Sequence, residues 1–169
     1  MFGPLKKVNE RELVDAVLAF GSGFYKCLRR SMDVSNIDML VLQMEFPLLA
    51  ISVTNTFIGL RQKNPRKLMA INTRNASMAY GVHFERLAKG QVSAASYAAR
   101  LATNLADGQG AAYARIVSEE SPGDQPQQLI SYFLERVNAP IPAAAMDETI
   151  NGVATSLSRL IDDLRLVGV

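Results

Sequence analysis

The chain has 169 residues, of which 49% are hydrophobic and 20% charged, and its formal net charge is +2. This composition excludes an intrinsically disordered chain and is typical of one folded domain over residues 1–169 with a substantial apolar core. The single cysteine, Cys27, excludes an internal disulfide framework and any metal site built from several cysteines.

The N-terminal segment and the most apolar stretch both bear on where the protein resides. Residues 1–7 contain Lys6 and Lys7, but no apolar stretch follows them as in a secretory signal peptide. Residues 40–60 are strongly apolar but contain Glu45 and Pro47, whereas a membrane-spanning helix needs about 20 predominantly apolar residues with few or no charges. We therefore expect a soluble, cytoplasmic protein without membrane insertion.

A first helix is predicted by apolar residues at helical spacing, namely Val14, Val17, Leu18, Gly21, Phe24, Tyr25 and Leu28. Gly21 and Gly23 inside this pattern predict either the close approach of a neighbour or a break into two helices. Ser35, with Asp38 three residues later, is typical of an N-cap and predicts the start of the next helix.

Residues 37–60 are apolar on two helical faces, which predicts a helix buried in the middle of a bundle. Pro47 is expected to kink or restart this helix, because an interior proline costs about 3 kcal/mol. Residues 51–57 also alternate as a β-strand would. No second segment of comparable quality is available to pair with such a strand, so the helix is favoured.

Further helices are predicted beyond residue 60. Asn64 and Pro65 suit the N-cap and first position of a helix that ends near Lys89 and Gly90. An alanine-rich helix from residue 94 ends near Asp107, and a shorter helix covers about 111–117. Asp124 and Pro126 then suit the start of a helix that reaches residue 137, before a break at 138–142.

The last predicted helix carries a seam of apolar residues at heptad spacing, formed by Ile150, Val153, Leu157, Leu160, Leu164 and Val167. Packing inside its own bundle is favoured over a seam for a homodimer or a partner helix, because the pattern is shorter than the ~3–4 heptads of a confident coiled coil. The sequence therefore predicts an all-α, single-domain bundle of five to seven helices.

No catalytic signature is present. The sequence His83-Phe84-Glu85 matches only the first part of the zinc-deaminase pattern, and a hydrogen-bonded histidine at a packed face is favoured. Glu45 is a candidate buried carboxylate with a raised pKa, but it also suits an ion pair with an arginine or a solvent-facing helix end. We therefore expect no catalytic residue, no metal site and no cofactor, and a protein that is not an enzyme.

The chain has no acidic residue between Glu45 and Glu85, yet this window holds five cations: Arg61, Lys63, Arg66, Lys67 and Arg74. Arg61 and Lys63 follow a helix, where cations complement the macrodipole. Arg66 and Lys67 fall at the second and third positions of the next helix, where each cation is unfavourable by about 0.3–1 kcal/mol. An anion bound at this helix start would compensate that cost.

A second basic cluster comprises Lys26, Arg29 and Arg30 on the first helix. Residues 1–103 hold 14 Lys and Arg against 7 Asp and Glu, whereas residues 104–169 hold 4 against 9. Such segregation bears on partners rather than on fold. It also leaves two simpler interpretations: a solvated basic face, or cations paired inside the fold with acids of the C-terminal half, such as Glu119, Glu120, Asp162 and Asp163.

The leading hypothesis is a non-enzymatic subunit of a larger assembly, which contacts nucleic-acid backbone through both basic clusters without reading sequence. Copies of the chain could also stack head to tail, basic half against acidic half. The alternatives are a protein-interaction or dimerisation module that docks an acidic partner, and a small-molecule-binding bundle with Glu45 and His83 as polar groups.

Overall fold

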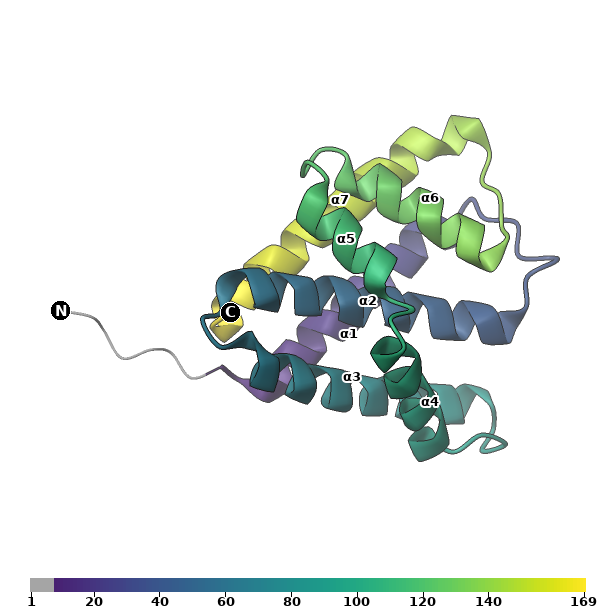
Figure 1. Cartoon of the computed structure of the whole chain (residues 1–169). Helices are drawn as coiled ribbons and strands as arrows, with labels where there is room; N and C mark the ends of the chain where they lie inside the picture. The colour runs from purple at the N-terminus through teal and green to yellow at the C-terminus, as the bar shows by residue number, and fades with distance from the viewer. Residues whose placement is uncertain (1–7) are drawn as a thin grey trace.

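Seven α-helices joined by loops form residues 8–169, the part of the chain that the computed structural model describes (Figure 1). Residues 1–7, where no signal peptide is expected, lie outside the described residues. The all-α prediction of five to seven helices is confirmed. The helices are α1 (Glu10–Arg29), α2 (Met39–Arg61), α3 (Pro65–Leu87), α4 (Ala94–Ala106), α5 (Ala111–Glu119), α6 (Gln125–Val137) and α7 (Ala143–Val167).

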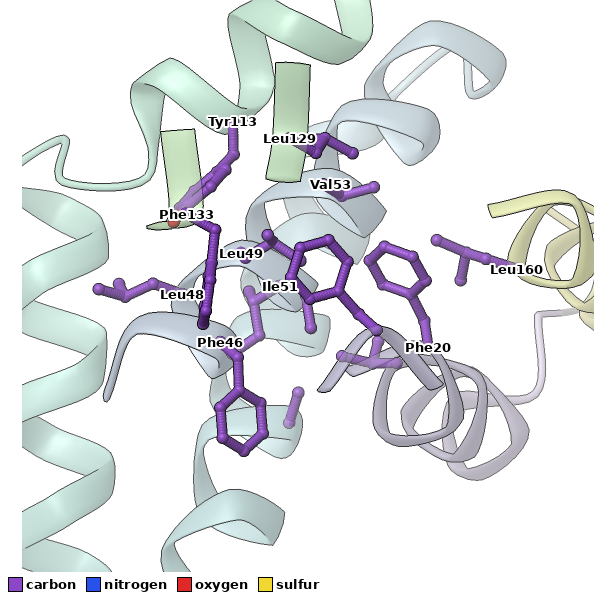
Figure 2. Close-up of a cluster of buried hydrophobic side chains, with 14 of the residues drawn as sticks. Phe20, Phe46, Leu48, Leu49, Ile51, Val53, Tyr113, Leu129, Phe133 and Leu160 are labelled. Carbon is purple, nitrogen blue, oxygen red and sulfur yellow. The ribbon is translucent and has the colours of Figure 1, made fainter. Parts of the chain in front are cut away.

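Helix α2 lies at the centre and packs against α1, α3, α4, α5 and α6. Its side chains from Phe46 to Val53 are buried, as two apolar faces require. Figure 2 shows them in one buried cluster with Phe20 of α1, Tyr113 of α5, and Leu129 and Phe133 of α6, and Leu160 of α7 lies on the other side of Phe20. By length and composition α2 could also cross a membrane, but 72% of its most apolar 18-residue window is buried in the bundle.

The start and the middle of α2 differ from the sequence-based expectation. Asp38 is the N-cap, its Oδ1 accepting the Leu40 N–H at 2.8 Å, whereas Ser35 bonds to Asp33. The prediction of Ser35 as the cap is therefore wrong. The helix continues through Pro47 and through residues 51–57, so neither a restart nor a strand is found. Packing on all sides compensates the backbone hydrogen bond that proline cannot make.

The close approach expected at the glycines of the first helix is found at Gly21. The Tyr80 side chain from α3 lies over this buried residue and donates its hydroxyl to the Val17 carbonyl at 3.4 Å. A Cβ at position 21 would overlap the Tyr80 hydroxyl. Helix α1 remains unbroken, so the alternative of two shorter helices is wrong.

The heptad seam of α7 faces the interior of its own bundle. Val153, Leu157, Leu160, Leu164 and Val167 are all buried. Ile150 is half-buried against the same core. The seam therefore packs within its own bundle, as the favoured interpretation expects.

Helices α3 and α4 approach each other closely at Gly81, which gives a test of the packing. A Cβ at this position would overlap the carbonyl oxygen of Ala94 at the start of α4. Because a backbone atom cannot move aside as a flexible side chain does, Gly81→Ala is expected to lower the free energy of unfolding by about 1–3 kcal/mol. Chemical denaturation of the purified protein measures this loss.

The matched control is Gly59→Ala in α2. There a new Cβ would meet only the Met69 sulfur at 3.9 Å, an ordinary contact. Alanine is a better helix former than glycine by about 0.8–1 kcal/mol, so this variant should gain stability. Equal stability changes in the two variants would contradict the close approach of α3 and α4.

Candidate polyanion-binding corner and apolar groove

Four exposed cations surround the turn between α2 and α3, and a fifth, Arg74, lies about two and a half turns along α3. We call the five together, Arg61, Lys63, Arg66, Lys67 and Arg74, the basic corner. Helix α3 begins at Pro65, so Arg66 and Lys67 occupy its second and third positions as predicted. Asn64 stands at the cap position, but its side chain makes no capping hydrogen bond. The first turn of α3 therefore presents uncapped N–H groups beside side chains of positive charge.

The contacts of the basic corner leave its charges uncompensated. The Arg61 guanidinium lies 5.6 Å from the centre of the Phe57 ring and donates to the Ile161 carbonyl at 3.5 Å. The Arg74 Nε donates to Asn75 Oδ1 at 3.3 Å. Within residues 8–169, none of the five cations forms an ion pair with an acid. Pairing with acids of the C-terminal half is therefore not what holds them.

The second basic cluster lies at the other end of the bundle. The Asn9 N–H at the start of α1 donates to the Val167 carbonyl, and the Gln62 side chain beside the basic corner donates to the Gly168 carbonyl. The start of α1 and the basic corner thus share one end. Lys26, Arg29 and Arg30 lie in the last turn of α1 and just after it, at the far end of a helix whose axis is about 30 Å long (Figure 1). The two clusters do not form one face.

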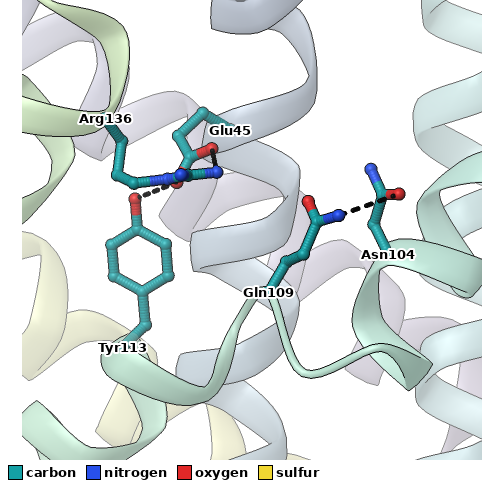
Figure 3. A network of polar contacts seen from close by, with 5 residues as sticks. All are labelled: Glu45, Asn104, Gln109, Tyr113 and Arg136. Carbon is teal, nitrogen blue, oxygen red and sulfur yellow. Dashed lines mark hydrogen bonds and ion pairs between the residues drawn. The ribbon is translucent and has the colours of Figure 1, made fainter.

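Glu45 is the buried charge of the central helix, and its partners come from two other helices (Figure 3). Tyr113 on α5 donates its hydroxyl to Glu45 Oε1 at 2.6 Å. Arg136 on α6 donates its Nε to the same oxygen at 3.2 Å and its Nη2 to Oε2 at 3.4 Å. Of the alternatives for Glu45, the ion pair with an arginine is therefore the correct one.

This network changes the acidities of its members. The hydrogen bond to Glu45 and the charge of that carboxylate raise the pKa of Arg136. Burial raises the pKa of Tyr113 well above its usual value, and the negative charge of Glu45 is the second cause of this rise. Both groups therefore keep their protons at neutral pH. An arginine and a tyrosine held in this way anchor the Glu45 carboxylate between three helices.

His83 is exposed, so the expectation of a hydrogen-bonded histidine at a packed face is wrong. The buried positions in this half of α3 are Tyr80, Gly81 and Phe84, which lie on another side of the helix. Glu45 and His83 therefore do not line a common pocket.

A groove of about 970 Å³ opens between α2, α3, α4 and α5, and we call it the α2–α5 groove. One face of each helix lines it, mostly with small or apolar residues. Its lining comprises Ser52, Asn55, Thr56, Gly59 and Leu60 of α2; Met69, Ala70, Thr73, Arg74, Ser77 and Met78 of α3; Ala95, Ala98, Ala99, Ala102, Leu105 and Ala106 of α4; Gly108 and Gly110 of the following loop; and Ala111 and Ala114 of α5.

The polar groups of the groove gather on α2 and α3. Asn55 donates its amide to the Thr73 hydroxyl at 2.9 Å and accepts from the Asn72 amide at 2.9 Å. Ser77, only 1% exposed, lines the groove, and its hydroxyl has no hydrogen-bond partner in residues 8–169. Most buried hydroxyls have a partner, so an unsatisfied one at the wall of a groove is a chemical feature to be explained.

The loop between α4 and α5 connects the two walls of the groove that these helices form. The Gln109 side chain donates to Asn104 Oδ1 at 3.4 Å (Figure 3), and the Gln109 N–H donates to the Asn104 carbonyl at 3.0 Å. Gly110 is buried against Ser52 of α2, where a Cβ would overlap the serine hydroxyl. The glycine thereby lets α5 start directly on the central helix.

The groove was not predicted from the sequence. Its strongest local signal is alanine on both the buried and the exposed sides of α4, as at Ala98 and Ala99. Alanine is also the best helix former, so the same residues predict a helix equally well without any groove.

Comparison with known proteins identifies no relative. No family model matches the sequence, and neither a curated protein nor a solved structure matches significantly.

Proposed function

We propose that this protein is a non-enzymatic helical subunit of a larger assembly, which binds nucleic-acid backbone at its basic corner. The observation that carries the proposal is that five exposed cations gather where no acid of residues 8–169 pairs with them. Arg66 and Lys67 also stand at a helix start that disfavours positive charge. A phosphate would relieve that cost and accept hydrogen bonds from the uncapped N–H groups.

The contact is proposed to be independent of base sequence. Four of the five cations of the basic corner surround a helix start, where phosphates bind, rather than lining a helix with side chains suited to base edges. Because Lys26, Arg29 and Arg30 lie at the opposite end of the bundle, the proposed nucleic-acid contact involves the basic corner alone. The nucleic acid then meets about 3–5 cations, and salt should weaken the affinity accordingly.

The test is the salt dependence of binding to unrelated single- and double-stranded oligonucleotides. For wild-type protein the logarithm of affinity should fall linearly with the logarithm of salt concentration. In Arg66→Ala/Lys67→Ala the slope on duplex should be shallower by about 2, since each phosphate contact contributes about 0.9. Fluorescence anisotropy at four or more salt concentrations measures both slopes.

The matched control is Arg29→Ala/Arg30→Ala, which removes two exposed cations at the opposite end of the bundle. Arg29 makes no ion pair within residues 8–169, and Arg30 lies 3.9 Å from Glu148 in an exposed pair of small energetic value. For this control variant, the slope of log affinity against log salt concentration should equal that of wild type. Absence of binding at low salt would overturn the proposed function, and equal slopes in all three proteins would remove the basic corner as the site.

A further inference from the structure

The phenylalanines and tyrosines of residues 8–169 leave no ring free to stack on a nucleobase. The phenylalanines of this range are all buried, and so are most of its tyrosines. Tyr25 and Tyr132 are half-buried, and each packs against another ring, Tyr25 on Phe46 at 5.1 Å between centroids and Tyr132 on Tyr113 at 4.9 Å. The chain contains no tryptophan. The stacking of successive bases, on which proteins that bind single strands rely, therefore has no platform in this range.

The basic corner itself lacks an exposed ring. Phe57 lies about one turn before Arg61 on α2, but it is buried, and the Arg61 guanidinium lies over its face at 5.6 Å from the ring centre. His83 is exposed on α3, yet it lies about 13.5 Å along the axis beyond Arg74 and on the opposite side of the helix. A nucleic acid at the basic corner thus meets cations without a ring to hold its bases.

Lys67 and Arg74 form a row of exposed cations along α3. Their positions are about two turns or 10.5 Å apart along the axis and share one side of the helix, with the exposed Ala70 between them. At the helix start the row meets Arg66 and the uncapped N–H groups. The helix fixes this spacing, and about 10.5 Å equals the axial rise of about three phosphates along one strand of a duplex.

We propose that the basic corner binds double-stranded nucleic acid in preference to single strands, with the duplex backbone lying along the row of Lys67 and Arg74. This inference rests on the proposed function, since it names the form of nucleic acid that the same site takes. A duplex keeps its bases stacked inside and displays its phosphates outside at fixed intervals, so it needs no ring from the protein. It also carries one charge per about 1.7 Å of axis, a higher density than one strand has.

Counterion release sets the size of the preference. Each phosphate contact contributes about 0.9 to the slope of log affinity against log salt concentration on duplex, and about 0.7 on a single strand. Over about 3–5 contacts, two such lines that meet near 1 M salt differ by about 6- to 20-fold in affinity at about 50 mM salt. A stacking platform would oppose this difference, because it adds contacts to bases that only a single strand offers.

The test uses one labelled oligonucleotide of mixed sequence, alone and annealed to its complement. Fluorescence anisotropy at about 50 mM salt should give a duplex affinity about tenfold higher than that of the strand. The pair is measured once as DNA and once as RNA, because both share the phosphate backbone, and tighter binding of the duplex in either supports the inference. Single strands that bind as tightly as their duplexes in both, or more tightly, overturn it.

Adding a ring to the row tests the reason for the preference. Ala70→Trp places an indole between Lys67 and Arg74 at an exposed position. It should raise single-strand affinity by about fivefold or more, the effect of one stacked base, without raising duplex affinity. Wild-type single-strand affinity in this variant, shown to be folded by thermal unfolding, would overturn the row as the contact.

The matched control for the added ring is Ala144→Trp. This position is exposed at the start of α7, whereas the end of α7 lies beside the basic corner, where the Gln62 side chain donates to the Gly168 carbonyl (Figure 1). Ala144→Trp therefore adds the same indole at the opposite end of the bundle. It should bind both forms of the oligonucleotide as wild type does.

The outcomes separate this inference from the proposed function. If neither form binds at low salt, the proposed function fails and the inference falls with it. If the single strand binds as tightly as the duplex and Arg66→Ala/Lys67→Ala weakens both, the proposed function stands and only the inference fails.

Discussion

Arg136→Met should lower the free energy of unfolding by about 2–3 kcal/mol. Breaking a buried ion pair from one side typically costs about 3–5 kcal/mol, because the remaining charge has no partner. Glu45 is that remaining charge, with a side chain only 3% exposed. The cost is placed at or below the lower end of the range because the Arg136 side chain is 41% exposed and Tyr113 still donates to the carboxylate. Urea denaturation at pH 7 measures the change.

A double-mutant cycle shows whether the unpaired charge is the cause. Glu45→Gln keeps an oxygen that accepts a hydrogen bond from the Tyr113 hydroxyl, and the unpaired Arg136 stays partly exposed to water. This variant should therefore lose only about 1 kcal/mol of the free energy of unfolding. The double variant Glu45→Gln/Arg136→Met should then be more stable than Arg136→Met alone. A double variant as unstable as Arg136→Met would show that the loss comes from packing of the arginine stem instead.

Alkaline pH should destabilise the protein strongly, by about 4 kcal/mol at pH 11. Burial raises the pKa of Tyr80, Tyr97 and Tyr113 far above the value of about 10 in an unfolded chain. A raised folded-state pKa means that the stabilisation is complete below pH 10 and is lost as the pH rises toward the folded-state pKa. Each tyrosine that stays protonated in the folded state lowers the free energy of unfolding by about 1.4 kcal/mol per pH unit above 10, and the contributions of the three tyrosines add.

Tyr80→Phe isolates one of these contributions. The Tyr80 hydroxyl makes only a long hydrogen bond of 3.4 Å to the Val17 carbonyl, so the variant should lie within about 1 kcal/mol of wild type at pH 8. Between pH 10 and 11 its stability should fall about one third less steeply. Denaturant titrations at half-unit pH steps give both slopes, and equal slopes for variant and wild type would contradict a buried, protonated Tyr80.

Local features of the sequence were sufficient for most helix positions. Pro65 sets the start of α3, because its fixed backbone angle and missing N–H suit the first position of a helix. The heptad spacing of α7 identifies its buried side. The prediction of Ser35 as the cap fails because Asp38 offers the same kind of short acceptor three residues later. Which of the two caps the helix depends on which one the chain geometry brings to the free N–H groups.

The sites depended on neighbours that are distant in the chain. Glu45 meets Tyr113 and Arg136, 68 and 91 residues later, and no pattern around position 45 indicates those partners. The α2–α5 groove exists because four helices leave a space that small residues do not fill. Its unpartnered Ser77 hydroxyl is evident only once the surrounding contacts are known.

The sequence alone determined that this protein is all-α, that its central helix is buried, and that Arg66 and Lys67 stand where a helix disfavours cations. Those properties follow from spacing and from charge within one or two turns, which the chain carries wherever its helices lie. Only the tertiary structure decided that the two basic clusters lie at opposite ends of the bundle, that Glu45 is neutralised internally, and that an apolar groove with one cation lies beside the basic corner. These are relations between helices, and packing of side chains far apart in the chain sets them.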